Sequence, residues 1–278
     1  MSKTEIVPKG RYRFRITRNI QSYRDQIIVH TYKVGGDYAD CVNISYTYRN
    51  NLPVQARMPH LLFEPECAVG SFLEKGSGTE LMIKTAIQYA YEDVKTIPFF
   101  EFDDDSHIDC VEKDMTATPP RKPKKPLNLA YFYIAYHGMT WYEARFNAKM
   151  LDVDKYRAYK LSLSFLTDPG QKLPFLQFLQ IIGRSLETLD GIGALESYYT
   201  RTATYRGFFD LIPKTKRCDM LYGWLTTFMD HYIGTTFYDK GWFIDARDMG
   251  ALNATQSGGS LSSNRSYRIF SYKRMSCL

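Results

Sequence analysis

Residues 67–102 read CAVGSFLEKGSGTELMIKTAIQYAYEDVKTIPFFEF, and this stretch decides the predicted fold. Over residues 79–93 apolar side chains recur every three or four positions, which is typical of one face of an amphipathic helix. Apolar segments with the length of short strands flank this helix, at residues 67–73 and 97–102. The stretch therefore predicts a strand, a glycine-rich turn, a helix and a second strand.

The residues that precede this stretch predict three strands joined by short turns, at residues 9–16, 26–34 and 42–49. In the first of them basic side chains alternate with Tyr12 and Phe14, so that one face is basic and the other apolar. The basic face either contacts phosphate groups, such as those of nucleic acid, or is a solvated face that discourages pairing with another chain.

The rest of the chain has mainly helical patterns. Helices are predicted at residues 127–151, with a break at Gly138, at 173–189 and at 219–233. Strands are predicted at residues 161–166 and 267–273. An extended proline- and lysine-rich loop is predicted at 116–126, and a flexible Ser/Gly-rich segment at 254–264. We therefore predict an α+β protein with a mixed, mostly antiparallel sheet flanked by helices. Residues 1–151 would form the α/β core and residues 152–278 a mainly helical extension.

The net charge, the cysteine spacing and the lack of long apolar runs argue against several classes of protein. The 278 residues carry a net charge of +6 and five scattered cysteines, an odd number with no Cys-x-x-Cys pair. This spacing argues against a disulfide framework or a zinc finger, so we expect reduced thiols. No apolar run approaches the roughly 20 residues of a membrane span, and the N-terminal residues lack the apolar region of a signal peptide. We expect an intracellular protein, or one inside a virus particle, that is not secreted.

The glycine-rich turn is the best candidate for a binding site. Backbone amides of Gly76, Ser77, Gly78 and Thr79 stand at the start of the predicted helix, where glycines permit close approach and the helix dipole favours an anion. The spacing is neither that of a Walker loop nor that of the dinucleotide fingerprint. The alternative is an ordinary turn into a helix, with Thr79 as its cap.

In these residues the chain resembles the GCN5-related N-acetyltransferase superfamily. That family places Gln/Arg-x-x-Gly-x-Gly/Ala between a strand and a long helix, and Gly76 and Gly78 match its two small positions. Leu73 departs from the pattern, because it stands where Gln or Arg is usual. The tyrosine-rich segment at residues 128–150 also resembles segments of acetyltransferase-like proteins of large DNA viruses. The resemblance implies acetyl-CoA as a cofactor, held by residues 76–79.

The same resemblance suggests catalytic residues. The family carries a tyrosine near the coenzyme A sulfur, and the tyrosine-rich segment 128–150 offers Tyr142 and Tyr136 as the acid that protonates the thiolate. Glu101 or Glu143 would be the base. Each has an alternative interpretation, a tyrosine in the core or a glutamate on the surface. The acidic run at residues 101–109 is interpreted as a solvated loop, and no metal site is predicted.

Two functions follow as expectations. The first is an acetyl-CoA-dependent N-acetyltransferase that transfers an acetyl group to an amine. The alternative is a non-enzymatic structural or packaged protein, associated with a virion or capsid, that keeps the acetyltransferase-like fold and contacts nucleic acid through its basic segments. In either case residues 219–233 offer a large apolar surface, so the C-terminal helical part is expected to bind a protein partner in an assembly.

Overall fold

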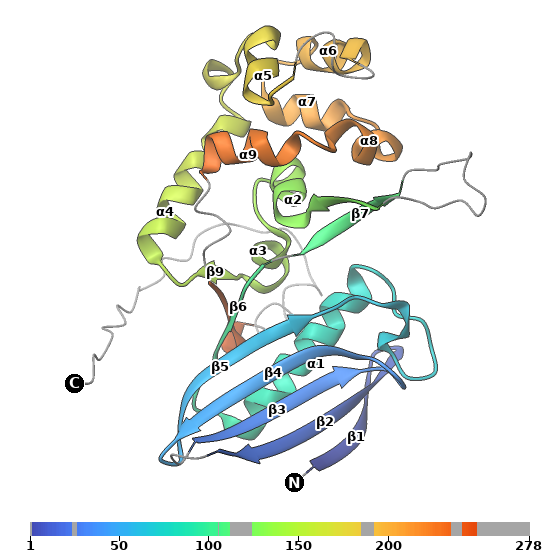
Figure 1. The fold of residues 1–278 in the computed structure, drawn as a ribbon, viewed down its shortest axis with the longest axis vertical. Coiled ribbons are helices and arrows are strands. Elements are labelled where there is room, and N and C mark those ends of the chain that lie inside the picture. Colours follow the sequence, from blue (N-terminus) through green and yellow to red (C-terminus); the bar gives the residue numbers. More distant parts are fainter. Residues whose placement is uncertain are drawn as a thin grey trace, which may run out of the picture.

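A computed structural model describes residues 2–23, 27–104, 106–111, 124–184, 192–234 and 241–248 of the chain. Within these ranges the protein is α+β, with an eight-stranded, mostly antiparallel sheet and a helical region beside it (Figure 1). The predicted fold class is confirmed. The predicted Ser/Gly-rich segment at 254–264 and the strand at 267–273 lie outside the described residues.

The sheet begins as a five-stranded antiparallel meander. Its strands are β1 (Ser2–Lys9), β2 (Tyr12–Ser22), β3 (Ile27–Gly35), β4 (Asp40–Arg49) and β5 (Leu52–Leu61). Helix α1 (Ser77–Val94) then crosses over to β6 (Phe99–Phe102), which lies parallel to β5. Two short strands complete the sheet, β10 (Trp242–Asp245) and β9 (Lys149–Met150). Because β10 follows the helical region in sequence, the chain leaves the sheet and returns to it.

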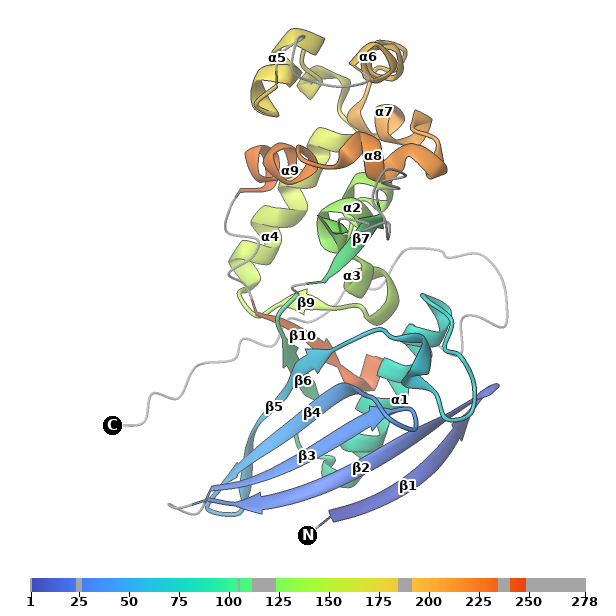
Figure 2. The same cartoon turned by 45° about the vertical axis from the view of Figure 1, so that its right-hand side comes forward.

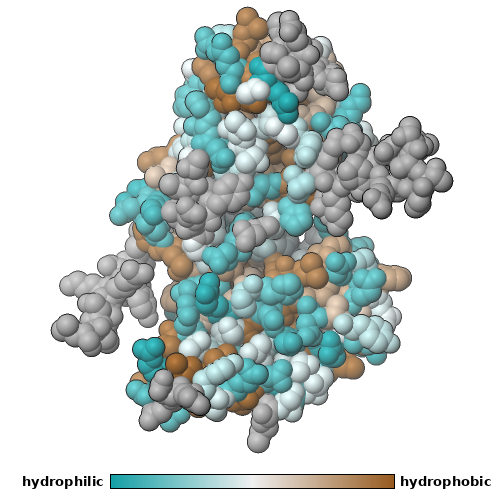
Figure 3. All heavy atoms as spheres, in the orientation of Figure 1, coloured by the Kyte–Doolittle hydropathy of each residue, from teal (hydrophilic) through white to brown (hydrophobic). Residues whose placement is uncertain are grey.

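Period-two patterning explains how the meander packs. Phe14 on β2, Tyr32 on β3 and Tyr46 on β4 are buried on one face, and α1 covers that face. The Tyr32 hydroxyl donates a hydrogen bond to Asp93 near the end of α1. The opposite face carries polar residues such as Thr31 and is largely hydrophilic or neutral in the surface view (Figure 3). Alternation of side chains along a strand thus assigns one face to the core and the other to solvent.

The helical region lies beyond the edge of the meander that β5 forms (Figure 2). It is entered through the hairpin of β7 (His107–Val111) and β8 (Lys124–Asn128). Its helices are α2 (Leu129–His137), α3 (Trp141–Phe146), α4 (Val153–Ser162), α5 (Phe175–Ile181), α6 (Ile192–Thr200), α7 (Tyr205–Leu211), α8 (Arg217–Leu221) and α9 (Leu225–Ile233). Its core is a cluster of fully buried aromatic rings, among them Phe165, Phe178, Phe208, Trp224 and Phe228.

Several predicted elements are wrong. Residues 67–73 are not a strand, since a 3-10 helix (Pro65–Cys67) precedes a single bridge between Ala68 and Ser71. Residues 161–166 are not a strand either, because they continue α4 into the 3-10 helix Leu163–Leu166. The alternation of leucine and serine at residues 161–164 resembles the period of a strand, but a segment this short does not override the helix that precedes it.

Other elements differ in their limits. The helix predicted at 219–233 is two helices, α8 and α9, separated at Gly223, which has φ +80°. Of the loop predicted at 116–126, residues 124–126 belong to β8, while residues 116–123 lie outside the described residues. The helix predicted at 173–189 spans only α5 within the described residues. The break predicted at Gly138 is confirmed, because this residue ends α2 in the left-handed conformation.

The expectation of reduced thiols throughout is also wrong. Cys41 at the start of β4 and Cys67 in the 3-10 helix form a disulfide, and both side chains are fully buried. The two residues are 26 positions apart in sequence, and only the turn of the chain after β5 brings them together. Spacing alone does not reveal a pairing of this kind.

Candidate functional site

The glycine-rich turn forms the start of α1. Gly76 is its N-cap residue with φ 87°, a conformation that glycine adopts without strain, and no side chain caps the helix. A carboxylate occupies the outer side of the turn instead. Glu74 accepts a hydrogen bond from the Ser77 hydroxyl at 3.0 Å and forms an ion pair with Arg11 at 2.5 Å. That ion pair, together with the Ser77 hydrogen bond, lowers the pKa of Glu74 below its usual value.

The inner side of the turn is filled by side chains. A Cβ atom at Gly78 would lie 2.9 Å from Leu73 Cδ1 and 3.3 Å from the Tyr12 hydroxyl. Leu73 is only 4% exposed, so it is a core residue rather than a lining group of a groove. Gly76 is different, since a Cβ there would meet nothing within 4 Å. The turn at residues 76–79 is therefore open to a ligand beside Gly76, whereas Leu73 and Tyr12 fill the space beside Gly78.

The candidate base Glu101 lies on β6, the strand at which the pairing changes from antiparallel to parallel. Parallel pairing of β5 with β6 is limited to the pair Arg57 and Glu101, and the two strands diverge beyond it (Figure 1). Glu101 accepts a hydrogen bond from the Gln55 side chain at 2.8 Å. Its neighbour Phe102 is buried on the opposite face of the strand.

The candidate acid Tyr142 is buried in the aromatic core. It is 5% exposed, and its ring centroid lies 4.6 Å from that of Phe102. Burial, with a smaller effect of the nearby Asp104 carboxylate, raises the pKa of Tyr142 well above its usual value. Because Tyr142 packs against Phe102, it lies on the opposite face of β6 from Glu101. The structure therefore does not bring this acid and this base to one site.

The other candidate base, Glu143, has a structural role. It forms a capping box with Thr140 at the start of α3, in which each side chain accepts from the other residue's backbone N–H. Its carboxylate also accepts hydrogen bonds from the hydroxyls of Tyr156, at 3.0 Å, and Tyr159, at 2.7 Å, and it forms an ion pair with Lys160 at 3.2 Å. A carboxylate with this many donors is not free to remove a proton from a substrate.

The remaining candidate, Tyr136, lies on α2 and is 6% exposed. The Arg217 guanidinium stacks over its ring, 3.7 Å from the centroid. Its hydroxyl is buried and has no hydrogen-bond partner. Of the four catalytic candidates, Tyr142 and Glu143 belong to α3, which is joined to the start of α1 through the ion pair of Arg145 with Glu80 at 3.3 Å.

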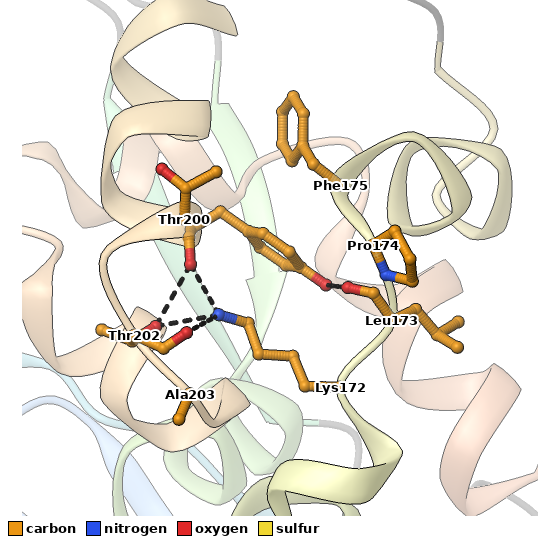
Figure 4. A pocket seen from close by; sticks show the side chains of 8 residues that line it. Lys172, Leu173, Pro174, Phe175, Thr200, Thr202 and Ala203 are labelled. Carbon is orange, nitrogen blue, oxygen red and sulfur yellow. Dashed lines mark hydrogen bonds between the residues drawn. The ribbon is translucent and has the colours of Figure 1, made fainter.

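Sequence reasoning missed a surface hollow of about 390 Å³ between α5 and α6 (Figure 4). Lys172 crosses it, and its ammonium group donates to the carbonyls of Tyr199 and Thr202, both at 2.5 Å, at the C-terminal end of α6. Burial lowers the pKa of Lys172. Lys172 therefore serves as a cap for α6, and its charge is not free for a ligand.

The described residues contain neither a metal-binding cluster nor a membrane-spanning helix. No group of three or more His, Cys, Asp or Glu side chains is placed to hold a metal ion there. No helix within the same residues is long and apolar enough to cross a membrane. Comparison of the chain with protein-family models, with curated proteins and with solved structures finds no significant match.

Proposed function

We propose that this protein is a non-enzymatic structural protein, built on an acetyltransferase-like α+β core, that binds a protein partner in an assembly such as a virus particle. The observation that carries the proposal is the filled turn at the start of α1. Leu73 and the Tyr12 hydroxyl occupy the space next to Gly78, and the Glu74 carboxylate stands at the outer side. An anionic pyrophosphate would have to displace Leu73 and Tyr12, and the ion pair of Glu74 with Arg11 leaves it no uncompensated positive charge on the outer side.

The catalytic candidates support the same proposal. Glu143 is saturated by donors, and Tyr142 and Glu101 lie on opposite faces of β6. Acid–base catalysis requires both groups within hydrogen-bond reach of one reacting centre. Core packing and helix capping account for these residues without any reaction.

The helical region offers apolar side chains for a partner. Leu161 on α4 and Leu176 on α5 are 71% and 61% exposed. Leu151, just before α4, and Val153, its first residue, are about half exposed. Interfaces between proteins bury side chains of this kind in their centres. These exposed residues lie outside the sheet, so binding through them would leave the α/β core intact.

Calorimetry of the full chain with acetyl-CoA tests the proposal directly. We expect no heat of binding at millimolar ligand and no acetylation of a panel of polyamines and peptides. Acetyl-CoA binding accompanied by turnover would refute the structural role. A co-purified partner that is lost from the double variant Leu161→Asp/Leu176→Asp, but retained by Leu52→Asp on the exposed end of β5, would support it.

A second candidate function is the binding of acetyl-CoA. It is favoured by one observation, the divergence of the parallel strands β5 and β6 after the pair Arg57 and Glu101, next to the crossover helix α1. The open space at Gly76 would accept one phosphate group. If acetyl-CoA binds, Gly76→Val should weaken it by at least tenfold, because a side chain would block the approach to the amides.

A further inference from the structure

A second group of polar side chains, at the C-terminal end of α2, has donors without acceptors. The Tyr136 hydroxyl and the Arg206 Nε atom are both buried and have no hydrogen-bond partner. Buried donors are almost always paired in proteins, and each unpaired one costs about 1–3 kcal/mol. Two such donors lie near the same helix end, and an acceptor oxygen placed there would remove the cost of leaving them unpaired.

The two arginines at this place are fixed in position. Arg206 on α7 donates to the carbonyl of Tyr136 at 2.5 Å and to that of Ile134 at 3.4 Å, and so holds the end of α2. Arg217 in α8 donates from Nε to the Ile212 carbonyl at 3.4 Å and stacks on the Tyr136 ring. The terminal nitrogens of Arg217 donate to no acceptor among the described residues. Stacking holds this guanidinium in place and leaves its two terminal nitrogens available to donate to a ligand.

Positive charge dominates the surroundings. Neither Arg206 nor Arg217 forms an ion pair within the described parts of the chain. The pKa of His137, the last residue of α2, is consistent with this positive potential. Burial lowers this pKa most, and the guanidinium groups of Arg206, Arg217 and Arg145 lower it further. The carboxylate of Asp210 opposes them. Uncompensated arginines beside a buried phenol form an environment that an anion would stabilise.

We propose that Tyr136, Arg206 and Arg217 form a binding site for a phosphate group at the junction of α2, α7 and α8. A phosphate offers several strong acceptor oxygens, which match the phenol O–H, the Arg206 Nε–H and the free fork of Arg217. Burial raises the pKa of Tyr136 above its usual value, so the phenol stays protonated and able to donate at neutral pH. The site is separate from the start of α1, and it does not depend on whether acetyl-CoA binds there.

Thermal unfolding of the full chain in sodium phosphate and in sodium chloride, at matched ionic strength, tests the proposal. A ligand that binds the folded state raises the Tm with its concentration, so phosphate should raise it more than chloride. Arg217→Gln should remove the difference. Tyr136→Phe should weaken phosphate binding about tenfold, the effect of one hydrogen bond to a charged group. Arg157→Gln is the control, because Arg157 lies on α4 and is paired with Asp154.

The outcomes are distinct. Equal Tm values of the wild type in phosphate and chloride would overturn the proposal, and so would a phosphate effect that persists unchanged in Arg217→Gln. If circular dichroism shows that Arg217→Gln is unfolded, Arg217→Lys replaces it, since it keeps the charge but not the planar fork, and weakened phosphate binding is expected. Adenosine monophosphate serves as a second probe: tighter binding than inorganic phosphate would assign the site to a nucleotide, and equal binding would assign it to free phosphate.

Discussion

Arg145 on α3 forms an ion pair with Glu80 in the first turn of α1, with 3.3 Å between the guanidinium nitrogen and the carboxylate oxygen. Glu80 also pairs with Lys84 at 2.7 Å, and the side chains of Glu80 and Lys84 are only 13% and 10% exposed. This carboxylate therefore connects the helical region to the helix that covers the sheet. It also neutralises a lysine that would otherwise be buried without a partner.

Replacing this carboxylate should destabilise the protein. Glu80→Gln leaves Lys84 nearly buried and without its ion pair, so we expect the free energy of unfolding to fall by about 2 kcal/mol. Asp154→Asn is a matched control, because Asp154 also stands in the first turn of a helix but forms an exposed pair with Arg157. It should cost at most about 1 kcal/mol. Urea denaturation of both variants measures the difference, and equal losses would contradict the role given to Glu80.

The close packing of Gly78 against Leu73 leads to a second prediction, on stability. Gly78 and Gly193 are each the second residue of a helix, α1 and α6. A Cβ at Gly78 would press on Leu73, whereas one at Gly193 would meet nothing within 4 Å. We expect Gly78→Ala to lower the free energy of unfolding by about 1 kcal/mol, and Gly193→Ala to raise it by up to about 1 kcal/mol. Chemical denaturation compares them, and a stabilising Gly78→Ala would show that the turn is not filled.

The disulfide between Cys41 and Cys67 should contribute substantially to stability. Cross-links of this sequence separation remove about 3.5 kcal/mol of chain entropy from the unfolded state. We therefore expect Cys41→Ala/Cys67→Ala to lose about 3 kcal/mol. Mass spectrometry of peptides from a non-reducing digest locates the bond. Recovery of both cysteines as free thiols, with an unchanged free energy of unfolding in the double variant, would exclude it.

The lowered pKa of His30 leads to a prediction of how stability depends on pH in the acidic range. Burial, and then the Arg18 guanidinium, lowers the pKa of His30 in the folded state, while Asp93 opposes the shift. The unfolded state therefore binds the proton more readily. The stabilising contribution is fully present above the unfolded pKa of about 6.5 and is lost as the pH falls through the lower folded value. Thermal unfolding between pH 7.5 and about 5 should show a steeper loss of Tm for the wild type than for His30→Asn. Parallel curves would contradict this role.

Local patterning was enough to predict much of the fold. Alternating apolar residues in β2, β3 and β4 each produced a strand with one buried face, because the side chains of a strand alternate whatever its neighbours are. Apolar residues at helical spacing predicted α1 within one or two residues of its limits. Gly138 ended α2 as expected, because glycine adopts the left-handed conformation of a helix end without strain.

Tertiary contacts decided the rest. Local sequence is enough to predict a turn into a helix at residues 76–79, but the packing of Leu73 and Tyr12 against Gly78 fills the inner side of that turn. The disulfide, the return of β10 to the sheet and the cluster of Tyr136, Arg206 and Arg217 join residues far apart in the chain. A periodic pattern records which face of an element is apolar. It does not record which distant element covers that face, because long-range contacts form only when the whole chain packs.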